Sequence, residues 1–332
     1  MSVELLYIIA FLLPLVLTPA SLPAFVLFAH RKHITEGPGE RRRQEKPIAV
    51  TGGSVIMLVM VISLMTVNVF HDMSPLFTLL CVMVMLYVFG VMDDTLGLKW
   101  YNKLVVQTFA VIFLYFGSGY GVHSLYGVFG VGDLSPCLSF LLTLVFGVGI
   151  LNAVNFADGI DGLASSVGIL TGAIMGYWHM RHGFEIQALI SFIMVGVMLA
   201  FYFFNVFSKR YKSYMGDSGS LVLGIFMYVI VCDDNASLLS GSFLADNYSQ
   251  SFVIAVLSYI FFDFVRVILL RIIRHKAPYE GDRTHLHHIY VDMGLNHLLA
   301  TNSILLGNIL VIAIWFVTAK TGMPVIPQLL VT

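Results

Sequence analysis

Carboxylates, amides and histidines gather in four short segments of this chain, each beside a long apolar run. The segments are Asp93-Asp94 with Lys99 and Lys103; Asn152 to Gly162; Tyr214 to Ser220, which contains Met-Gly-Asp-Ser-Gly; and Asp282 to His288, which ends in His-Leu-His-His. Phosphoryl transfer between two anions needs such groups, because negative charge must be neutralised and a hard cation is usually held by oxygen ligands. The residue types therefore indicate phosphate chemistry.

Six side chains supply oxygens that suit a divalent cation: Asp93, Asp94, Asn155, Asp158, Asp161 and Asp217. On a continuous helix, Asn155, Asp158 and Asp161 would lie along one side, because they are spaced three residues apart. Glycines directly after Asp158 and Asp161, and on both sides of the Asp217-Ser pair, would let backbone N–H groups approach phosphate oxygens.

Each segment taken alone also has a simple structural explanation. Adjacent aspartates can cap a helix or form a turn, the Gly-Asp-Ser-Gly sequence can join two spans, and the His-rich loop can be solvated or bind metal adventitiously. Lys103 can be an interfacial anchor. Asp263 and Arg266, three residues apart in an apolar run, suit a buried structural pair. The shared position of the four segments, at one set of span ends, favours a common site.

The elements that must position these residues are apolar. Of 332 residues, 58% are hydrophobic and 11% are charged, and the mean hydropathy is +0.88, which indicates a protein in lipid. Long runs without alternation predict helices rather than barrel strands. We expect an all-α polytopic membrane protein, one domain over 1–332, with about ten transmembrane helices of roughly 20 residues each. These spans are expected at 3–29, 48–67, 76–92, 104–117, 137–151, 163–178, 187–206, 220–232, 251–271 and 299–318.

Most of the 18 Lys and Arg residues fall in one alternate set of loops, which favours the cytoplasmic side. The four polar segments lie on this side, so we expect active-site loops that face the cytoplasm. A transporter would hold its carboxylates near the bilayer midplane, whereas an enzyme acting on a lipid headgroup needs them at the interface. A transporter of nucleotide sugars or lipid-linked sugars and a catalytically silent scaffold are the competing classes.

The four segments, in this order, resemble the polyprenyl-phosphate N-acetylhexosamine-1-phosphate transferase family of membrane enzymes. Arg210-Tyr-Lys212 and Asp282-Arg283 look most similar to the bacterial undecaprenyl-phosphate GlcNAc-1-phosphate transferases that start O-antigen (lipopolysaccharide), enterobacterial common antigen or teichoic acid synthesis. The peptidoglycan branch, phospho-MurNAc-pentapeptide transferase, typically has three consecutive histidines, which this chain lacks. That branch is the alternative within the family.

The resemblance implies roles for individual residues. It implies a Mg²⁺ ion, with Mn²⁺ as the alternative, held by Asn155 and Asp217. Phosphates would be bound by Lys103 and Arg283. The implied catalytic residues are Asp93, Asp94, Asp158 and His285. The implied sugar-nucleotide-binding residues are Asn152, Asp161, His287 and His288.

The resemblance also implies the reaction, which is transfer of GlcNAc-1-phosphate, or a close HexNAc-1-phosphate, from a UDP-sugar to undecaprenyl phosphate with release of UMP. We expect direct attack by the lipid phosphate, because a monoester with a second pKa of about 6 is largely ionised near neutral pH. The expected setting is the bacterial inner membrane, with cell-wall or surface-glycan synthesis downstream. No nucleic-acid partner is expected, and a homodimer is compatible with the sequence. The exact sugar, the polyprenol length and the topology of the last 30 residues stay open.

Overall fold

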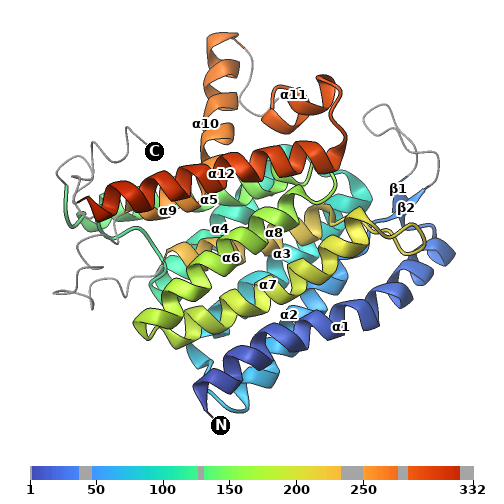
Figure 1. Cartoon of the computed structure of the whole chain (residues 1–332), viewed down its shortest axis with the longest axis horizontal. Helices are drawn as coiled ribbons and strands as arrows, with labels where there is room; N and C mark the ends of the chain where they lie inside the picture. The colour runs from blue at the N-terminus through green and yellow to red at the C-terminus, as the bar shows by residue number, and fades with distance from the viewer. Residues whose placement is uncertain (1, 37–46, 126–130, 233–249, 276–282, 322–332) are drawn as a thin grey trace.

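The computed structural model describes residues 2–36, 47–125, 131–232, 250–275 and 283–321, and most of them lie in α-helices. Most of the long helices run alongside one another in a single bundle (Figure 1). The helices are α1 (Val3–Lys32), α2 (Gly52–Asn68), α3 (Phe77–Leu96), α4 (Trp100–Ser118), α5 (Pro136–Ala157), α6 (Leu163–His182), α7 (Glu185–Val206), α8 (Gly216–Val231), α9 (Gln250–Val256), α10 (Ser258–Ile273), α11 (Leu286–Asp292) and α12 (His297–Lys320). A 3₁₀ turn, η1 (Ser74–Leu76), and a small antiparallel pair, β1 (Thr35–Glu36) with β2 (Ile48–Ala49), complete the described elements.

The length and composition of the helices make this a multi-pass membrane protein. Within the described ranges, five helices are long and apolar enough to cross a membrane: α1, α3, α5, α7 and α12. Two shorter apolar helices are α2 and α8. Each of the ten expected spans overlaps a helix, so a predominantly helical architecture is confirmed. The number of helices that cross the bilayer, and the side that each loop faces, stay predictions.

Helix α8 forms the centre of the bundle. Every residue from 218 to 231 is buried, and α8 packs against α2, α3, α5, α6 and α7. A helix surrounded on all sides has no polar face, which explains its uniformly apolar sequence after Ser220. The start of α8 is closely packed, because a Cβ on Gly53 of α2 or Gly90 of α3 would overlap the backbone at Ser218 and Gly219.

The span expected at 251–271 is wrong as one continuous helix, because α9 ends at Val256 and α10 begins at Ser258. Figure 1 shows α10 leaving the bundle, with α11 beside it. A helix break frees backbone groups that lipid cannot satisfy. Here the side-chain amide of Asn308 in α12 satisfies the backbone groups at the break. Its oxygen accepts from Tyr259 N (2.7 Å) and Ser258 Oγ (2.8 Å), and its nitrogen donates to Val256 O (3.1 Å).

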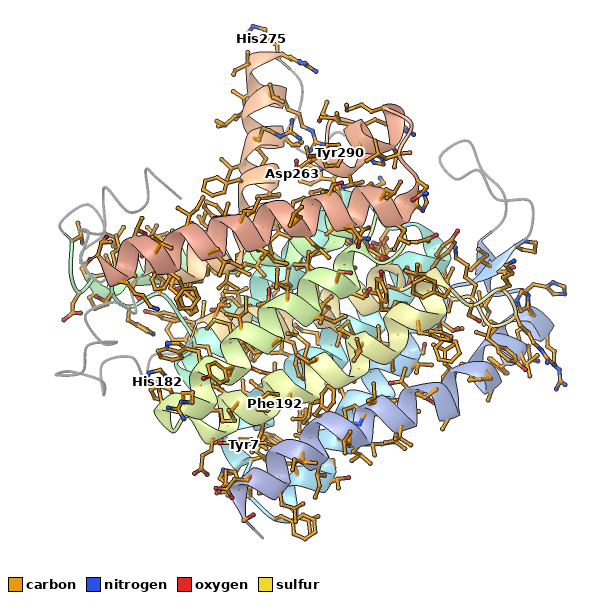
Figure 2. The ribbon with its side chains drawn as sticks, in the orientation of Figure 1. Tyr7, His182, Phe192, Asp263, His275 and Tyr290 are labelled. Carbon is orange, nitrogen blue, oxygen red and sulfur yellow. The ribbon has the colours of Figure 1, made fainter. Side chains whose placement is uncertain are left out.

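The expected site residues lie at one end of the bundle, and the N-terminus of α1 lies at the other. Figure 2 shows Tyr7 and Phe192 near the N-terminus of α1, where their ring centroids are 5.6 Å apart. It shows Asp263 at the base of α10 and His275 at the tip of that helix. The expected site residues lie at the opposite end from Tyr7, where α3 and α5 end and α4 and α8 begin.

Substitution of Gly90 tests the close packing of α3 against α8. Gly90→Ala places a methyl group against the Ser218 backbone, and overpacking of this kind costs about 1–3 kcal/mol. We expect a lower Tm for the purified protein in detergent. The matched control is Gly307→Ala in α12, where no atom lies within 4 Å of the new methyl group. Equal Tm values for the two variants would contradict the close approach.

Candidate active site

The ammonium group of Lys103 lies between carboxylates from two other helices. Its Nζ is 2.9 Å from Asp217 Oδ2 and 3.2 Å from Asp93 Oδ2, and it donates a hydrogen bond to Asn155 Oδ1 at 3.2 Å. The side chains of Lys103 and Asp93 are only 17% and 10% exposed. Lys103 is therefore not only an interfacial anchor: it holds α3, α4, α5 and α8 together through one charge.

A tight connection between α3 and α4 brings Asp93 and Lys103 together. Helix α3 ends at Leu96, and Gly97 adopts a left-handed conformation (φ 63°) that suits a residue without a Cβ. The N–H of Leu98 then donates to Asp93 Oδ1 at 2.7 Å. Because α4 begins at Trp100, Lys103 falls in its first turn and reaches back to the end of α3.

The neighbouring aspartate, Asp94, contacts the beginning of α8 instead. Its Oδ1 accepts from Asp217 N (2.7 Å), and its Oδ2 accepts from Ser218 N (3.1 Å) and Ser218 Oγ (2.8 Å). Asp94 thus caps a helix to which it does not belong, where the unpaired N–H groups favour a negative charge. The result is that Asp94 fixes the backbone of Asp217, whose side chain contacts Lys103.

Asn155, near the end of α5, completes the cluster around Lys103. Its amide nitrogen donates to Asp217 Oδ1 and to Ser220 Oγ, the latter at 2.7 Å. Asn152, one turn earlier, donates to the buried Gln107 of α4 at 2.7 Å. The structure therefore places Asn155 in the cluster and joins Asn152 to an interhelical amide pair.

The expectation that Asn155, Asp158 and Asp161 share one side of a helix is wrong. Helix α5 ends at Ala157, Asp158 is its C-cap residue, and Asp161 lies in the turn before α6. Gly162 at φ 84° makes this turn accessible to the backbone. The side chains of Asn155 and Asp161 consequently have different partners.

Asp161 joins two segments that sequence reasoning did not connect to it. Its Oδ2 lies 2.6 Å from Lys212 Nζ and 3.2 Å from His297 Nδ1, at the start of α12. Burial alone would raise the pKa of Asp161, but the hydrogen bonds from His297 and Lys212 hold this pKa below its usual range. Asp161 is therefore ionised near neutral pH. No spacing in the sequence indicates His297.

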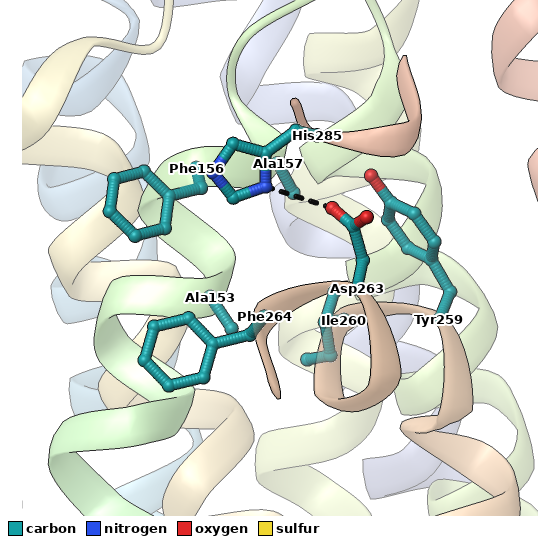
Figure 3. Close-up of a pocket in the computed structure, with 8 residues that line it drawn as sticks. All are labelled: Ala153, Phe156, Ala157, Tyr259, Ile260, Asp263, Phe264 and His285. Atoms are coloured by element: carbon teal, nitrogen blue, oxygen red, sulfur yellow. Dashed lines mark hydrogen bonds and ion pairs between the residues drawn. The ribbon is translucent and has the colours of Figure 1, made fainter. Parts of the chain in front are cut away.

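The late histidine motif folds over the end of α5. His285 Nδ1 lies 2.9 Å from Asp263 Oδ2, and the His285 ring faces the Phe156 ring with 4.8 Å between centroids (Figure 3). The expected pair of Asp263 and Arg266 is confirmed, at 2.6 Å. Its additional contact with His285 was not predicted, although a carboxylate within an apolar run was the available signal.

Arg283 and the last two histidines have separate environments. Arg283 Nη2 lies 2.5 Å from Asp292 Oδ1 in a half-exposed pair, while Asp282 lies outside the described residues. The His287 ring is buried, lies between the rings of His285 and His288, and abuts Gly159. Burial lowers the pKa of His287 to about 3, and its two histidine neighbours act in the same direction.

An apolar groove adjoins the histidine motif. Its volume is about 320 Å³, and α5 forms one wall while α9 and α10 form the other. A small cavity of about 10 Å³ is lined by Asp263, His285 and Phe156. The groove and the small cavity share Ala153, Ile260 and Phe264. The groove therefore lies next to the cavity that Asp263 and His285 line.

The oxygens around Lys103 suit a hard divalent cation. Asp93, Asp217 and Asn155 contribute two carboxylates and an amide within reach of one ammonium group. In the described part of the chain, no three His, Cys, Asp or Glu side chains are arranged to hold a metal by themselves. Mg²⁺ is usually bound by one or two carboxylates, with water and substrate phosphates completing its octahedron. The donor set at Lys103 fits that pattern.

Comparisons with known proteins identify the family of this chain. Residues 76–233 match the family model described as Glycosyl transferase family 4. Phospho-N-acetylmuramoyl-pentapeptide-transferase of Streptococcus sanguinis is 33% identical over 238 residues, covering 66% of this chain and 71% of that protein. This chain belongs to the polyprenyl-phosphate N-acetylhexosamine-1-phosphate transferase family.

A second branch of this transferase family is about as similar. Decaprenyl-phosphate N-acetylglucosaminephosphotransferase of Mycobacterium tuberculosis is 31% identical over 229 residues, which cover 63% of this chain and 55% of that protein. From the first branch, the phospho-N-acetylmuramoyl-pentapeptide-transferase of Lactococcus lactis is 32% identical over 245 residues, which cover 67% of this chain and 72% of that protein. Family membership thus establishes a membrane transferase of the polyprenyl-phosphate HexNAc-1-phosphate class, and the relatives act on different sugars.

The buried His287 predicts a stability that depends on pH. The pKa of His287 in the folded protein is about 3, below the value of about 6.5 in an unfolded chain. The unfolded state therefore binds more protons as the pH falls below 6.5, and the free energy of unfolding decreases by up to about 1.4 kcal/mol per pH unit. The Tm should fall between pH 7.5 and pH 5.5, and His287→Leu should reduce that fall.

The control for this measurement is His182→Leu. His182 is the last residue of α6, at the end of this helix that lies away from Asp161, and its ring is half-buried. This variant should retain the pH dependence of the unmodified protein. An unchanged dependence in His287→Leu would show that His287 accepts a proton in the folded state.

Proposed function

We propose that this chain transfers GlcNAc-1-phosphate, or a close HexNAc-1-phosphate, from a UDP-sugar to undecaprenyl phosphate, with release of UMP, at the cytoplasmic face of a bacterial inner membrane. The observation that carries the proposal is the single Lys103 ammonium shared by Asp93, Asp217 and Asn155 at one end of a membrane helix bundle. Such a cluster can bind a pyrophosphate and a hard cation together. Family membership supports the same reaction class.

Each residue of the cluster has a distinct proposed task. Lys103 turns from its carboxylates to the donor pyrophosphate and stabilises charge on it. Mg²⁺, held by Asp217 and Asn155, would supply further charge neutralisation at the same phosphates. Asp93 orients the lipid phosphate for in-line attack, and Asp94 keeps Asp217 in place through the start of α8. Asp161, Lys212 and His297 form the proposed subsite for the nucleotide.

The position of the polar groups supports an enzyme over a transporter. The cluster around Lys103 lies at the ends of α3 and α5 and the beginnings of α4 and α8. A transporter places its ion sites near the middle of the membrane, in broken helices. The one described break that interrupts an expected span, between α9 and α10, is satisfied by the amide of Asn308 and presents no carboxylate there.

The apolar groove is the proposed site of the lipid acceptor. Its lining is almost entirely apolar, and it passes from the middle of α5 toward His285. A polyprenyl chain in this groove would lie between α5 and α10, with its phosphate toward the polar end of the bundle. The amphipathic substrate is thereby held with its headgroup at the depth of the site.

The sugar specificity can be tested with purified protein, undecaprenyl phosphate and a panel of UDP-HexNAc donors, including UDP-MurNAc-pentapeptide. We expect a Mg²⁺-dependent lipid product with the mass of HexNAc-pyrophosphoryl-undecaprenol. A product from the pentapeptide donor would favour the branch represented by the 33% identical streptococcal relative. Asp217→Ala should lower the rate by about 10²- to 10³-fold, because it removes a charged group from the cluster.

The matched control is Asp72→Ala, which removes an exposed carboxylate between α2 and α3, where Asp72 accepts from Ser74 N. Its rate should stay within about twofold of the unmodified protein, as for most surface changes away from a site. Turnover by Asp217→Ala equal to that of this control would remove Asp217 from the proposed mechanism.

Substitution of Gly149 tests the groove. Gly149 lines it, and a Cβ there meets only Phe264, at 3.8 Å, so Gly149→Ala should be tolerated. Gly149→Phe places a ring in the groove and should raise the KM for undecaprenyl phosphate at least tenfold. The KM for the UDP-sugar should change little, because that substrate does not enter the groove. Equal KM values for the lipid in the Ala and Phe variants would place the acceptor elsewhere.

A further inference from the structure

Asp263 is a carboxylate with an unusual number of partners. Its side chain is 7% exposed, and both of its neighbours in sequence, Phe262 and Phe264, are apolar. Oδ1 accepts from Arg266 Nη2 (2.6 Å) and from Leu286 N (3.0 Å), and Oδ2 contacts His285 Nδ1 (2.9 Å). A buried carboxylate is destabilising unless it is paired and hydrogen-bonded. Charge neutralisation by Arg266 would be sufficient for a structural pair, so the contact with His285 needs its own explanation.

Of the two nitrogens of the His285 ring, one has a hydrogen-bond partner among the described residues and the other has none. Nδ1 faces Asp263, as Figure 3 shows, while Nε2 is buried and has no hydrogen-bond partner among the described residues. The ring is held in place by Phe156, with 4.8 Å between centroids, and by His287, at 5.6 Å. A buried polar atom without a partner is costly, and such atoms are often the ones that a ligand satisfies.

The location of the ring relates Nε2 to the lipid acceptor. His285, Asp263 and Phe156 line the small cavity, which shares three lining residues with the apolar groove. Phe156 directly follows Asn155, whose side chain contacts Lys103. His285 and the Lys103 cluster therefore contact consecutive residues at the end of α5, and a phosphate bound at this end of the groove would lie near both.

From these contacts we infer that Asp263 is a positioning residue for the lipid acceptor: it holds His285 as the tautomer with the proton on Nδ1, so that Nε2 accepts a hydrogen bond from the acceptor phosphate. This inference rests on the proposed function for its substrate. A carboxylate on Nδ1 selects that tautomer and orients the ring, as in other carboxylate–histidine pairs. When the phosphate is singly protonated, its P–O–H donates to Nε2; transfer of that proton to Nε2 leaves an imidazolium and a dianionic phosphate.

Two substitutions separate this role from a structural one. Asp263→Asn retains the shape of the side chain, but its amide group can donate to Nδ1 and favour the opposite tautomer. Arg266→Gln removes the ion pair and the hydrogen bond to Thr284 O while leaving the carboxylate on His285. We expect kcat to fall about 10- to 100-fold in Asp263→Asn, which is the loss typical when a carboxylate that orients a metal-ligating histidine is replaced in other proteins. The loss in Arg266→Gln should be several-fold smaller, and the KM for the UDP-sugar should stay within twofold in both.

The tautomer itself gives a readout that does not depend on activity. Histidine ¹⁵N NMR of the intact protein in detergent, with His285→Gln to identify the signal, should show a protonated Nδ1 and a bare Nε2 in the unmodified protein. Asp263→Asn should shift His285 toward a protonated Nε2.

A protonated Nε2 and bare Nδ1 in the unmodified protein would overturn the inference, and so would equal losses of kcat in Asp263→Asn and Arg266→Gln, or normal turnover in Asp263→Asn. If the unmodified protein formed no lipid product with any donor, the proposed function would fail. The tautomer would in that case still decide whether Asp263 positions His285.

Discussion

One ammonium group compensates two carboxylates where four helices meet. Lys103 contacts Asp93 and Asp217 at 3.2 and 2.9 Å, and these groups are largely buried. Two negative charges close together are unfavourable without a cation, and one Lys leaves the cluster with a net negative charge. This remaining negative charge is the feature on which the proposed binding of a divalent cation depends. The arrangement of the cluster depends on Asp94, because this residue fixes the backbone of Asp217 from the end of α3.

The stretch from Asn155 to Asp161, which comprises the end of α5 and the turn before α6, connects the parts of the site. Asn155 reaches the Lys103 cluster, Phe156 packs on His285, and Asp161 contacts Lys212 and His297. Because α5 ends at Ala157, these side chains diverge instead of following one helix face. A continuous helix would have placed Asn155, Asp158 and Asp161 along one side, whereas the turn directs Asn155 and Asp161 to different segments. This divergence allows one short stretch of chain to contact both the proposed donor and acceptor sides.

The break between α9 and α10 has a corresponding role on the lipid side. It turns α10 away from the bundle and opens the groove against α5, while Asn308 satisfies the backbone groups at the break. The same turn brings Asp263 under the histidine motif. A polar side chain at membrane depth is costly, and here both Asn308 and Asp263 satisfy specific partners that a straight helix would not present.

The sequence by itself indicated that the protein lies in lipid, that it is helical, and which enzyme family it resembles. Apolar runs without alternation leave only helices in lipid, and the order of the four polar segments carries the resemblance to the transferase family. The participation of Asp93, Lys103, Asn155 and Asp217 in one cluster could be anticipated, because each lies at the end of a run on the same side. Their contacts with one another then appear directly in the fold.

Tertiary structure alone decided the partner of each charge. Asp93 and Asp94 are adjacent in sequence but point to Lys103 and to the start of α8, since a helix directs successive side chains about 100° apart. Asp263 contacts His285 and Asp161 contacts His297 across separations of 22 and 136 residues, which no periodicity encodes. Local spacing specifies which face of an element is polar; only the packing of elements determines what that face meets.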